Sequence, residues 1–256
     1  MVKYLVSIAV LATVLATVQA QLKGYPPSEK VPDVKSAQVK AWLKEVDLSG
    51  APKIPIAKGI PGDAPKCNKR QLPNECHWTC FDCAADDITH VQREVAEGHH
   101  LASHTWSHTA LTTLTNEQIV AEMKWTEKAV LEATGLRLKY MRPPFGDINN
   151  RVRYVLKKLG YLVVDWTGDE FDTNDWDPEL SDSKKIALMT KSLNKYAAGK
   201  RTKGFYMLQH DQSASTVKLA PKLLPLGIAR NISFGNVPVC QGDSQPYQTV
   251  VKAPVV

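Results

Sequence analysis

Residues 104–126 read HTWSHTALTTLTNEQIVAEMKWT, and the fold is decided around this stretch. It opens with two histidines four positions apart, His104 and His108, in a turn that follows a short expected strand. Thr115, with Gln118 three residues later, has the capping-box pattern of a helix start. Apolar residues then recur at helical spacing. The stretch therefore predicts a histidine-bearing turn followed by an amphipathic helix.

Strands and helices are expected to alternate on both sides of this stretch. Strands are expected at residues 99–104, 136–140, 161–166, 205–209 and 232–239, and helices at residues 91–97, 115–134, 152–159, 186–193 and 217–228. Such alternation predicts an α/β domain built on a parallel sheet or barrel. A closed (β/α) barrel usually needs about 250 residues. The α/β region, residues 91–239, is much shorter, and it opens with a helix that has no strand before it, so part of the pattern is missing at its start.

The composition is that of a globular protein with a sizeable core. The chain has 256 residues, of which 43% are hydrophobic and 23% charged, which excludes a disordered, collagenous or coiled-coil chain. The net charge is +6, but the basic residues are dispersed, so a nucleic-acid partner is not expected. We expect a monomer.

The N-terminus reads as a secretory signal peptide at residues 1–20. Lys3 precedes an apolar run at residues 4–18, and small residues surround a cleavage site after Ala20. The run is shorter than the roughly 20 residues that a membrane-spanning helix needs, so we expect secretion to the cell wall or medium and no stable membrane span. The rest divides into an arm at residues 21–90 with one short helix capped by Ser36, a domain at 91–240 and a tail at 241–256.

The five cysteines are expected to be oxidised in an exported protein. Four of them, Cys67, Cys76, Cys80 and Cys83, are crowded in the arm, and Cys240 stands alone. A zinc ribbon would need a second pair of cysteines at a matching distance, so disulfides are favoured. We expect two local disulfides in the arm and a free Cys240. The alternative is a bridge from Cys240 to the arm, which would leave one arm cysteine without a partner.

Three further motifs each follow the end of an expected strand. Residues 142–146 read RPPFG, a rigid turn that can aim the Phe145 backbone N–H at an oxyanion. Residues 172–176 read DTNDW, and acidic groups beside tryptophan are common where sugars stack on aromatic faces. Residues 208–211 read LQHD, and His210 at the end of a parallel strand is suited to acid–base chemistry.

Taken in this order, the four motifs resemble those of the NodB-type polysaccharide deacetylases, and of the fungal chitin deacetylases of carbohydrate esterase family 4 in particular. The match runs from about residue 98 to residue 240. It implies a distorted (β/α) barrel, truncated here and preceded by a cysteine-rich arm. It also implies hydrolysis of N-acetyl groups from N-acetylglucosamine polymers such as chitin, giving chitosan and acetate.

The resemblance also assigns roles to residues of this sequence. His104 and His108 would bind a divalent metal, zinc by preference, and the pair's spacing fits that role. Arg142 would orient a catalytic aspartate, the Phe145 N–H would stabilise the oxyanion, and His210 would be the general acid. The residues expected to bind substrate are Trp106, Asp172, Asp175 and Trp176.

One motif of the resembled family is absent. A TFDDG-like sequence on the first strand should carry the catalytic base and the third metal ligand, and no such sequence occurs in the chain. The odd cysteine and the helix at 91–97, which has no strand before it, point to the same junction. We infer that a β-α-β stretch is missing between His90 and Val91.

Two hypotheses follow from this gap. In the first, the chain is a deacetylase in which Asp82, Asp86 or Asp87 substitutes for the missing carboxylates, with weak metal binding or none. In the second, it is a catalytically impaired remnant that binds cell-wall carbohydrate, or a mis-spliced product. Loss of a catalytic base costs about 10²- to 10⁴-fold in rate, and loss of a ligand as well should abolish activity.

Overall fold

A computed structural model describes residues 24–27, 30–59, 88–199, 203–211 and 214–250. The predicted signal peptide, the four arm cysteines and Asp82, Asp86 and Asp87 lie outside these residues. The helices are α2 Ala37–Lys44, α3 Ile88–Ala96, α4 Asn116–Thr134, α5 Asn150–Lys158, α6 Asp182–Ala198, α7 Ala214–Val217, α8 Ala220–Ile228 and α9 Val237–Cys240. Within the described ranges, no helix combines the length and the apolarity needed to cross a membrane.

The described residues also form four short strands: β1 Leu136–Leu138, β2 Tyr140–Met141, β3 Leu162–Val163 and β4 Tyr247–Val250. β2 pairs with β3 in parallel, and β1 pairs with β4 in antiparallel. Two isolated parallel bridges extend the pattern, Ser103 to Met141 and Asp172 to Leu208. The strands expected at residues 99–104 and 205–209 are therefore reduced to single bridges. The α/β alternation is present, but the described residues do not form a barrel.

The prediction of a last strand at residues 232–239 is wrong. The chain instead enters helix α9, whose N-cap Asn236 accepts a hydrogen bond from the Val239 N–H. Pro238 occupies the first turn of this helix, where a missing N–H costs nothing. The cap and the proline override the apolar run, which on its own is compatible with either a strand or a helix.

Residues after 240 pack on the domain. β4 lies against β1, and the Gln248 side chain donates hydrogen bonds to the carbonyls of Leu138 and Leu159. Lys139 also forms an ion pair with Asp243 at 2.7 Å. The segment expected to be a tail is therefore held in the fold up to residue 250.

Cys240 takes part in a disulfide, and its partner lies outside the described residues. The expectation that Cys240 carries a free thiol is therefore wrong. That expectation rested on the crowding of the four arm cysteines within 17 residues, which favours pairing among themselves. The pairing among Cys67, Cys76, Cys80 and Cys83 stays a prediction.

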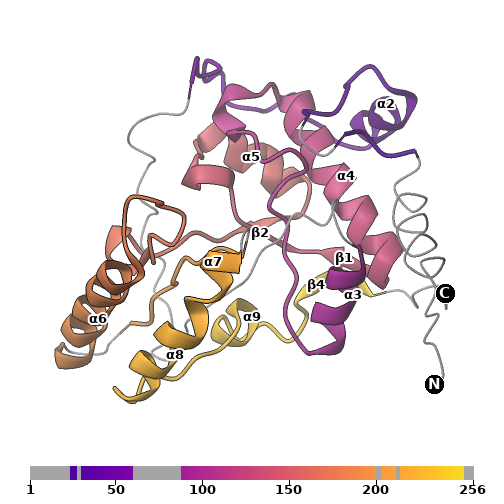
Figure 1. The fold of residues 1–256 in the computed structure, drawn as a ribbon. Coiled ribbons are helices and arrows are strands. Elements are labelled where there is room, and N and C mark those ends of the chain that lie inside the picture. Colours follow the sequence, from indigo (N-terminus) through magenta and orange to yellow (C-terminus); the bar gives the residue numbers. More distant parts are fainter. Residues whose placement is uncertain (1–23, 28–29, 60–87, 200–202, 212–213, 251–256) are drawn as a thin grey trace, which may run out of the picture.

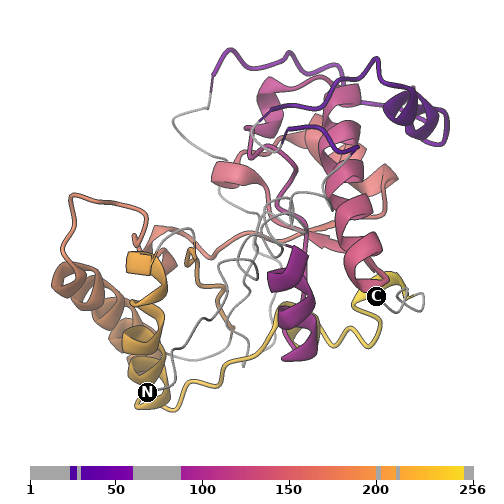
Figure 2. The same ribbon diagram turned by 45° about the vertical axis from the view of Figure 1, so that its right-hand side comes forward.

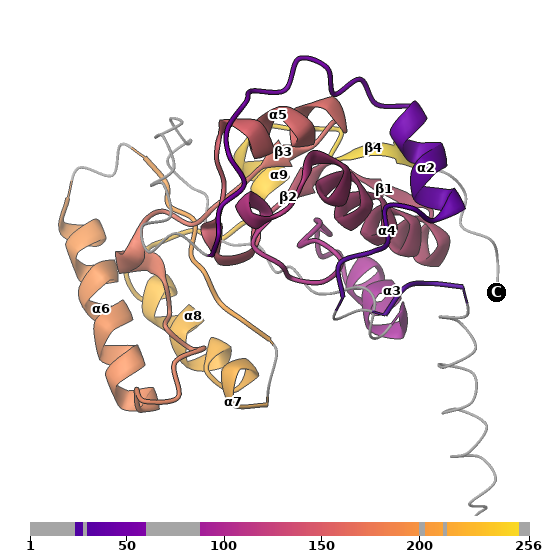
Figure 3. The ribbon, with the colours of Figure 1, turned by 90° about the horizontal axis from the view of Figure 1, so that it is seen from above.

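Two groups of helices flank the strands (Figures 1 and 3). In the first group, α4 and α5 surround a core that includes Leu111, Ile119 and Val152, and α2 packs on the outside of α4. In the second group, α6 and α8 close over Phe171 and Phe205, whose rings stack 3.8 Å apart. Figure 2 shows the two groups apart, joined by the strands and loops. The ends of β2 and β3 thus lie between two separately packed cores.

The N-terminal segment is part of the first core. Ser36 caps α2 by accepting a hydrogen bond from the Val39 N–H, as expected from the sequence. Trp42 of α2 meets Trp125 of α4 edge to face, with ring centroids 5.2 Å apart. α4 itself begins at the Thr115–Gln118 capping box and ends at Gly135, whose φ of 74° a glycine adopts without strain.

Candidate active site

The first motif places two imidazoles side by side. The ring centroids of His104 and His108 lie 4.8 Å apart, with the ring planes inclined at 73°. His104 is buried and its Nδ1 lies 2.7 Å from the Arg142 carbonyl oxygen, whereas His108 is exposed. Thr105 and His108 have positive φ values, 74° and 55°, and these tight backbone turns bring the rings together. The metal-binding role of the pair stays a prediction.

The surroundings favour neutral imidazoles at both positions. Burial, followed by the positive charge of Arg142, holds the pKa of His104 well below its usual value. The same two effects lower the pKa of His108. The charge of His210 contributes to both shifts, so these residues share one electrostatic environment. Neutral imidazole is the form that can bind a metal ion.

The RPPFG turn presents Phe145 beside this pair. Phe145 has a φ of 61°, and its ring, 45% exposed, meets the His108 ring edge to face at 4.8 Å. The next residue must be glycine, because a Cβ atom on Gly146 would come within 3.0 Å of the Trp166 ring. Arg142, at the other end of the turn, is buried, and its backbone N–H donates to the Ser103 carbonyl. The turn is fixed by close packing at both ends.

Hydrogen bonds of the side chains and of the backbone join the DTNDW and LQHD motifs. Asp175 accepts the His210 backbone N–H on one carboxylate oxygen and contacts His210 Nδ1 with the other, at 2.7 Å each. Hydrogen bonds between the backbones of residues 171–173 and 208 hold the two segments together. The Asp175 side chain is 1% exposed. It therefore holds His210 in place, and its expected role in substrate binding stays a prediction.

The two tryptophans expected to bind sugar lie in very different surroundings. Trp176 is 49% exposed, and its indole N–H donates to Asp172 at 3.2 Å. Trp106 is 2% exposed, stacks on Tyr25 and donates its indole N–H to the Pro27 carbonyl at 3.0 Å. The N-terminal segment covers Trp106, so a sugar cannot reach it in this structure. Trp176 remains the candidate platform.

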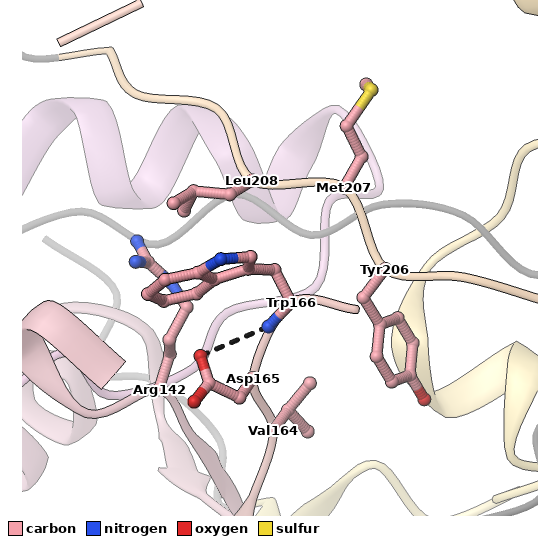
Figure 4. Close-up of a pocket in the computed structure, with 7 residues that line it drawn as sticks. All are labelled: Arg142, Val164, Asp165, Trp166, Tyr206, Met207 and Leu208. Carbon is pink, nitrogen blue, oxygen red and sulfur yellow. Dashed lines mark hydrogen bonds between the residues drawn. The ribbon is translucent and has the colours of Figure 1, made fainter. Parts of the chain in front are cut away.

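A small pocket lies beside Arg142, at the end of β3 (Figure 4). Asp165 and Trp166 line it together with Tyr206 and Leu208 from the neighbouring segment. Burial raises the pKa of Asp165 to about 6, against the opposing effects of the Trp166 N–H and the Arg142 charge. A carboxyl group that stays partly protonated near neutral pH therefore lines the pocket.

Two of the described carboxylates near the site, Asp147 and Glu122, were not predicted to belong to it. Asp147, directly after the RPPFG turn, is fully buried and accepts the Thr112 N–H and hydroxyl at 2.8 Å. Glu122 of α4 contacts the backbone of the loop between the two histidines. For Glu122, the signal in the sequence was a charged residue at an otherwise apolar helix position. For Asp147, the signal was its position directly after the RPPFG motif.

The residues present do not complete a metal site. His104 and His108 are two suitable ligands, but no group of three histidine, cysteine, aspartate or glutamate side chains that could hold an ion occurs within the described ranges. Catalytic zinc normally has three protein ligands. The three candidate substitutes, Asp82, Asp86 and Asp87, lie outside these ranges.

Comparison with known proteins places this site in a family context. A family model described as polysaccharide deacetylase matches residues 74–164. Chitin deacetylase 1 of Saccharomyces cerevisiae is 42% identical over an alignment that covers 71% of each chain. Chitin deacetylase 1 of Cryptococcus neoformans is 31% identical, with 82% of this chain and 56% of that protein covered. Three fungal chitin deacetylases are much longer than this chain, which spans 56%, 37% and 35% of their lengths.

The fold agrees with a solved structure from a fungus. The chitin deacetylase of Colletotrichum lindemuthianum superposes with a TM-score of 0.58 over 68% of this chain and 79% of that one. At 23% identity this likeness shows the fold alone. The described elements are thus those of the α/β fold of carbohydrate esterase family 4, mostly helical here and with few strands.

The alignment lengths reveal residues that the relatives have and this chain lacks. The alignment with the Cryptococcus protein is 268 residues long, more than the whole chain, although 82% of the chain takes part. The alignment with the Saccharomyces protein runs over 229 residues with 71% of the chain. Each relative therefore carries several tens of residues opposite gaps in this chain. This is the size of gap that a missing β-α-β stretch would leave.

Proposed function

Because this chain belongs to the polysaccharide deacetylase family, we propose that it recognises N-acetylglucosamine polymers such as chitin and carries part of the machinery that removes their acetyl groups. The observation that carries the proposal is that His210, whose Nδ1 is held by Asp175, contributes its charge to the surroundings of both His104 and His108. The names of the fungal relatives support chitin as the substrate class.

The described residues supply the second half of the reaction. In deacetylation, a water oxygen bonds to the acetyl carbon, the carbon–nitrogen bond breaks, and the nitrogen takes up a proton as acetate leaves. The Phe145 N–H would donate a hydrogen bond to the carbonyl oxygen as negative charge grows on it. His210, with its Nδ1 held by Asp175, would present Nε2 to protonate the departing amine. Trp176 would support the sugar ring from its exposed face.

Among the described residues, the groups that would activate water in the first half of the reaction are missing. The family is metal-dependent, but the described residues do not complete a metal site and contain no TFDDG aspartate that could act as the base. We therefore assign no step to a metal in this chain. We propose that it hydrolyses acetyl groups at least about 10²-fold more slowly than a version that carries the missing segment.

A restored chain tests this proposal. The TFDDG-bearing segment of a fungal chitin deacetylase is inserted between His90 and Val91, and acetate release from chitin oligomers is measured with added Zn²⁺. We expect activity in the restored chain and little in the natural one. His210→Ala should remove most activity from the restored chain and change almost nothing in the natural one. Equal activity of the natural and restored chains would refute the proposal.

A second candidate function is carbohydrate binding without hydrolysis. It is favoured by the lack of a three-ligand group within the described ranges, together with the exposed faces of Trp176 and Phe145. Retention of the natural chain on chitin beads, competed by chitin oligomers and unaccompanied by acetate release, would support this function. Absence of both retention and acetate release would argue against both candidates.

We also propose that the chain is secreted to the cell wall or medium as a monomer. The support is the apolar run at residues 4–18 with its small-residue cleavage site. N-terminal sequencing of the protein from a culture medium should begin at Gln21, and light scattering should give the mass of one chain.

A further inference from the structure

Glu122 carries a fully buried carboxylate that points at the backbone between the two site histidines. The residue lies on α4 and is 0% exposed. One carboxylate oxygen accepts the backbone N–H groups of Trp106 and Ser107, both at 2.8 Å. The other oxygen accepts the Ser107 hydroxyl at 2.6 Å. Glu122 therefore fixes the backbone midway between His104 and His108.

These contacts accompany an unusual backbone conformation, and that conformation determines where the two histidine rings lie. Thr105 and His108 lie in the left-handed region of φ, on either side of the two amides that Glu122 holds. Such conformations are unfavourable for residues that carry a Cβ atom, and they persist only where the surroundings enforce them. Two successive N–H groups that converge on one anion form a compact binding turn. The Glu122 carboxylate thus stabilises a loop conformation that would relax without it, because two residues of the loop have positive φ values.

The helix that carries Glu122 is a firm base for this contact. α4 has a complete capping box at Thr115 and a left-handed Gly135 at its end, and Ile119 and Met123 are fully buried on either side of Glu122 along the helix. A buried carboxylate is costly unless its oxygens are satisfied, and here three donors satisfy them. Burial raises the pKa of Glu122, and the hydrogen bonds from Ser107 and Trp106 oppose that rise.

We propose that Glu122 is the positioning residue of the His104–His108 pair, and that its carboxylate sets the relative placement of the two imidazoles. The inference rests on the proposed function in treating these histidines as site residues. Its test, however, uses neither hydrolysis nor a bound metal, so the two can fail separately.

The matched control is a second buried glutamate on the same helix. Glu127 is 4% exposed, pairs with Lys124 and Arg137, and accepts the Tyr161 hydroxyl at 3.2 Å. No contact of Glu127 involves the histidine loop. Glu127→Gln therefore removes a buried negative charge from α4 without changing the groups that hold residues 104–108.

The experiment is an NMR comparison of the full metal-free chain with Glu122→Gln, Glu122→Ala and Glu127→Gln. It records the amide proton signals and exchange rates of Trp106 and Ser107, and the nuclear Overhauser effect between the rings of His104 and His108. Thermal unfolding of each variant measures global stability. The amides report the contact itself, and the ring signal reports the placement of the histidines.

In the wild-type chain and in Glu127→Gln we expect the amide proton signals of Trp106 and Ser107 far downfield. We also expect a clear nuclear Overhauser effect between the two histidine rings. Glu122→Gln should move the amide signals upfield, speed their exchange about tenfold and weaken the ring contact, and Glu122→Ala should abolish that contact. If Glu122→Ala does not fold, Glu122→Gln decides. Unchanged amide and ring signals in Glu122→Gln, or equal changes in Glu127→Gln, would overturn the inference. Failure of the acetate assay would leave it standing.

Discussion

Asp175 holds His210 at two points, accepting its backbone N–H and contacting its Nδ1, each at 2.7 Å. The ring can therefore neither rotate nor shift along its segment without breaking a hydrogen bond. Since Asp175 is almost fully enclosed, both bonds are formed away from water, where they are stronger. The imidazole is kept with Nε2 as its outward-facing nitrogen.

Replacing this carboxylate should affect turnover far more than binding. In the segment-restored chain, Asp175→Asn should lower kcat for acetate release by about 10²- to 10⁴-fold, with little change in KM, because the amide cannot hold the His210 ring in the same tautomer and orientation. Asp177→Asn is the control, since Asp177 caps the Glu179 N–H on the same loop. A rise in KM at constant kcat would instead assign Asp175 to substrate binding.

Asp165 should make stability fall as the pH rises. Burial raises its pKa from 3.8 to about 6, so the folded state binds more protons than the unfolded state between these values. The stabilisation is complete below about pH 4 and lost as the pH rises through about 6. Asp165→Asn should flatten this dependence and raise the free energy of unfolding at pH 7.5 by about 3 kcal/mol.

Urea unfolding at pH 4 and at pH 7.5 measures this effect. The exposed carboxylate Asp169 provides the control variant, Asp169→Asn. If Asp165→Asn proved no more stable than Asp169→Asn at pH 7.5, ionisation of Asp165 would not destabilise the fold, and the prediction would be wrong.

The two tryptophans of the motifs should separate binding from stability. Trp176→Ala should weaken the binding of chitin oligomers about tenfold and leave the free energy of unfolding nearly unchanged, because the ring is half exposed. Trp106→Phe should leave binding unchanged and cost about 1 kcal/mol of stability, since it removes the hydrogen bond to Pro27. Calorimetric titration and urea unfolding of both variants check this. If Trp106→Phe weakened binding as much as Trp176→Ala, Trp106 would be assigned to the sugar-binding site.

Cys240 should be recovered in a cross-linked peptide. Digestion without reductant, followed by mass spectrometry, should join the Cys240 peptide to one that carries an arm cysteine, because no cysteine lies elsewhere in the chain. Cys240→Ser should cost about 2–5 kcal/mol of stability. Alkylation of Cys240 in the unreduced protein would contradict the bridge.

Features set by neighbouring residues could be predicted from the sequence. The capping box at Thr115 and the i, i+4 spacing of His104 and His108 are local, and both appear in the structure as expected. The helices at residues 115–134 and 152–159 were predicted for the same reason: three or four residues decide each turn.

Features set by distant residues could not be predicted. Asp175 and His210 are 35 residues apart, and only the pairing of their segments brings them together. The burial of Trp106 depends on Pro27, 79 residues earlier. The strand expected at 205–209 has the right composition, but a strand needs neighbours, and Leu208 has one bridge among the described residues.

The docking of the N-terminal segment on Trp106 and Trp125 has a practical consequence for anyone who divides this chain into fragments. A fragment cut to the family match at residues 74–164 would lose Tyr25 and α2, and also β4 at the other end. Two large indole rings and the edge of β1 would then face water, a combination that promotes aggregation. The stretch that identifies the family is therefore smaller than the stretch that must be expressed to obtain a soluble protein.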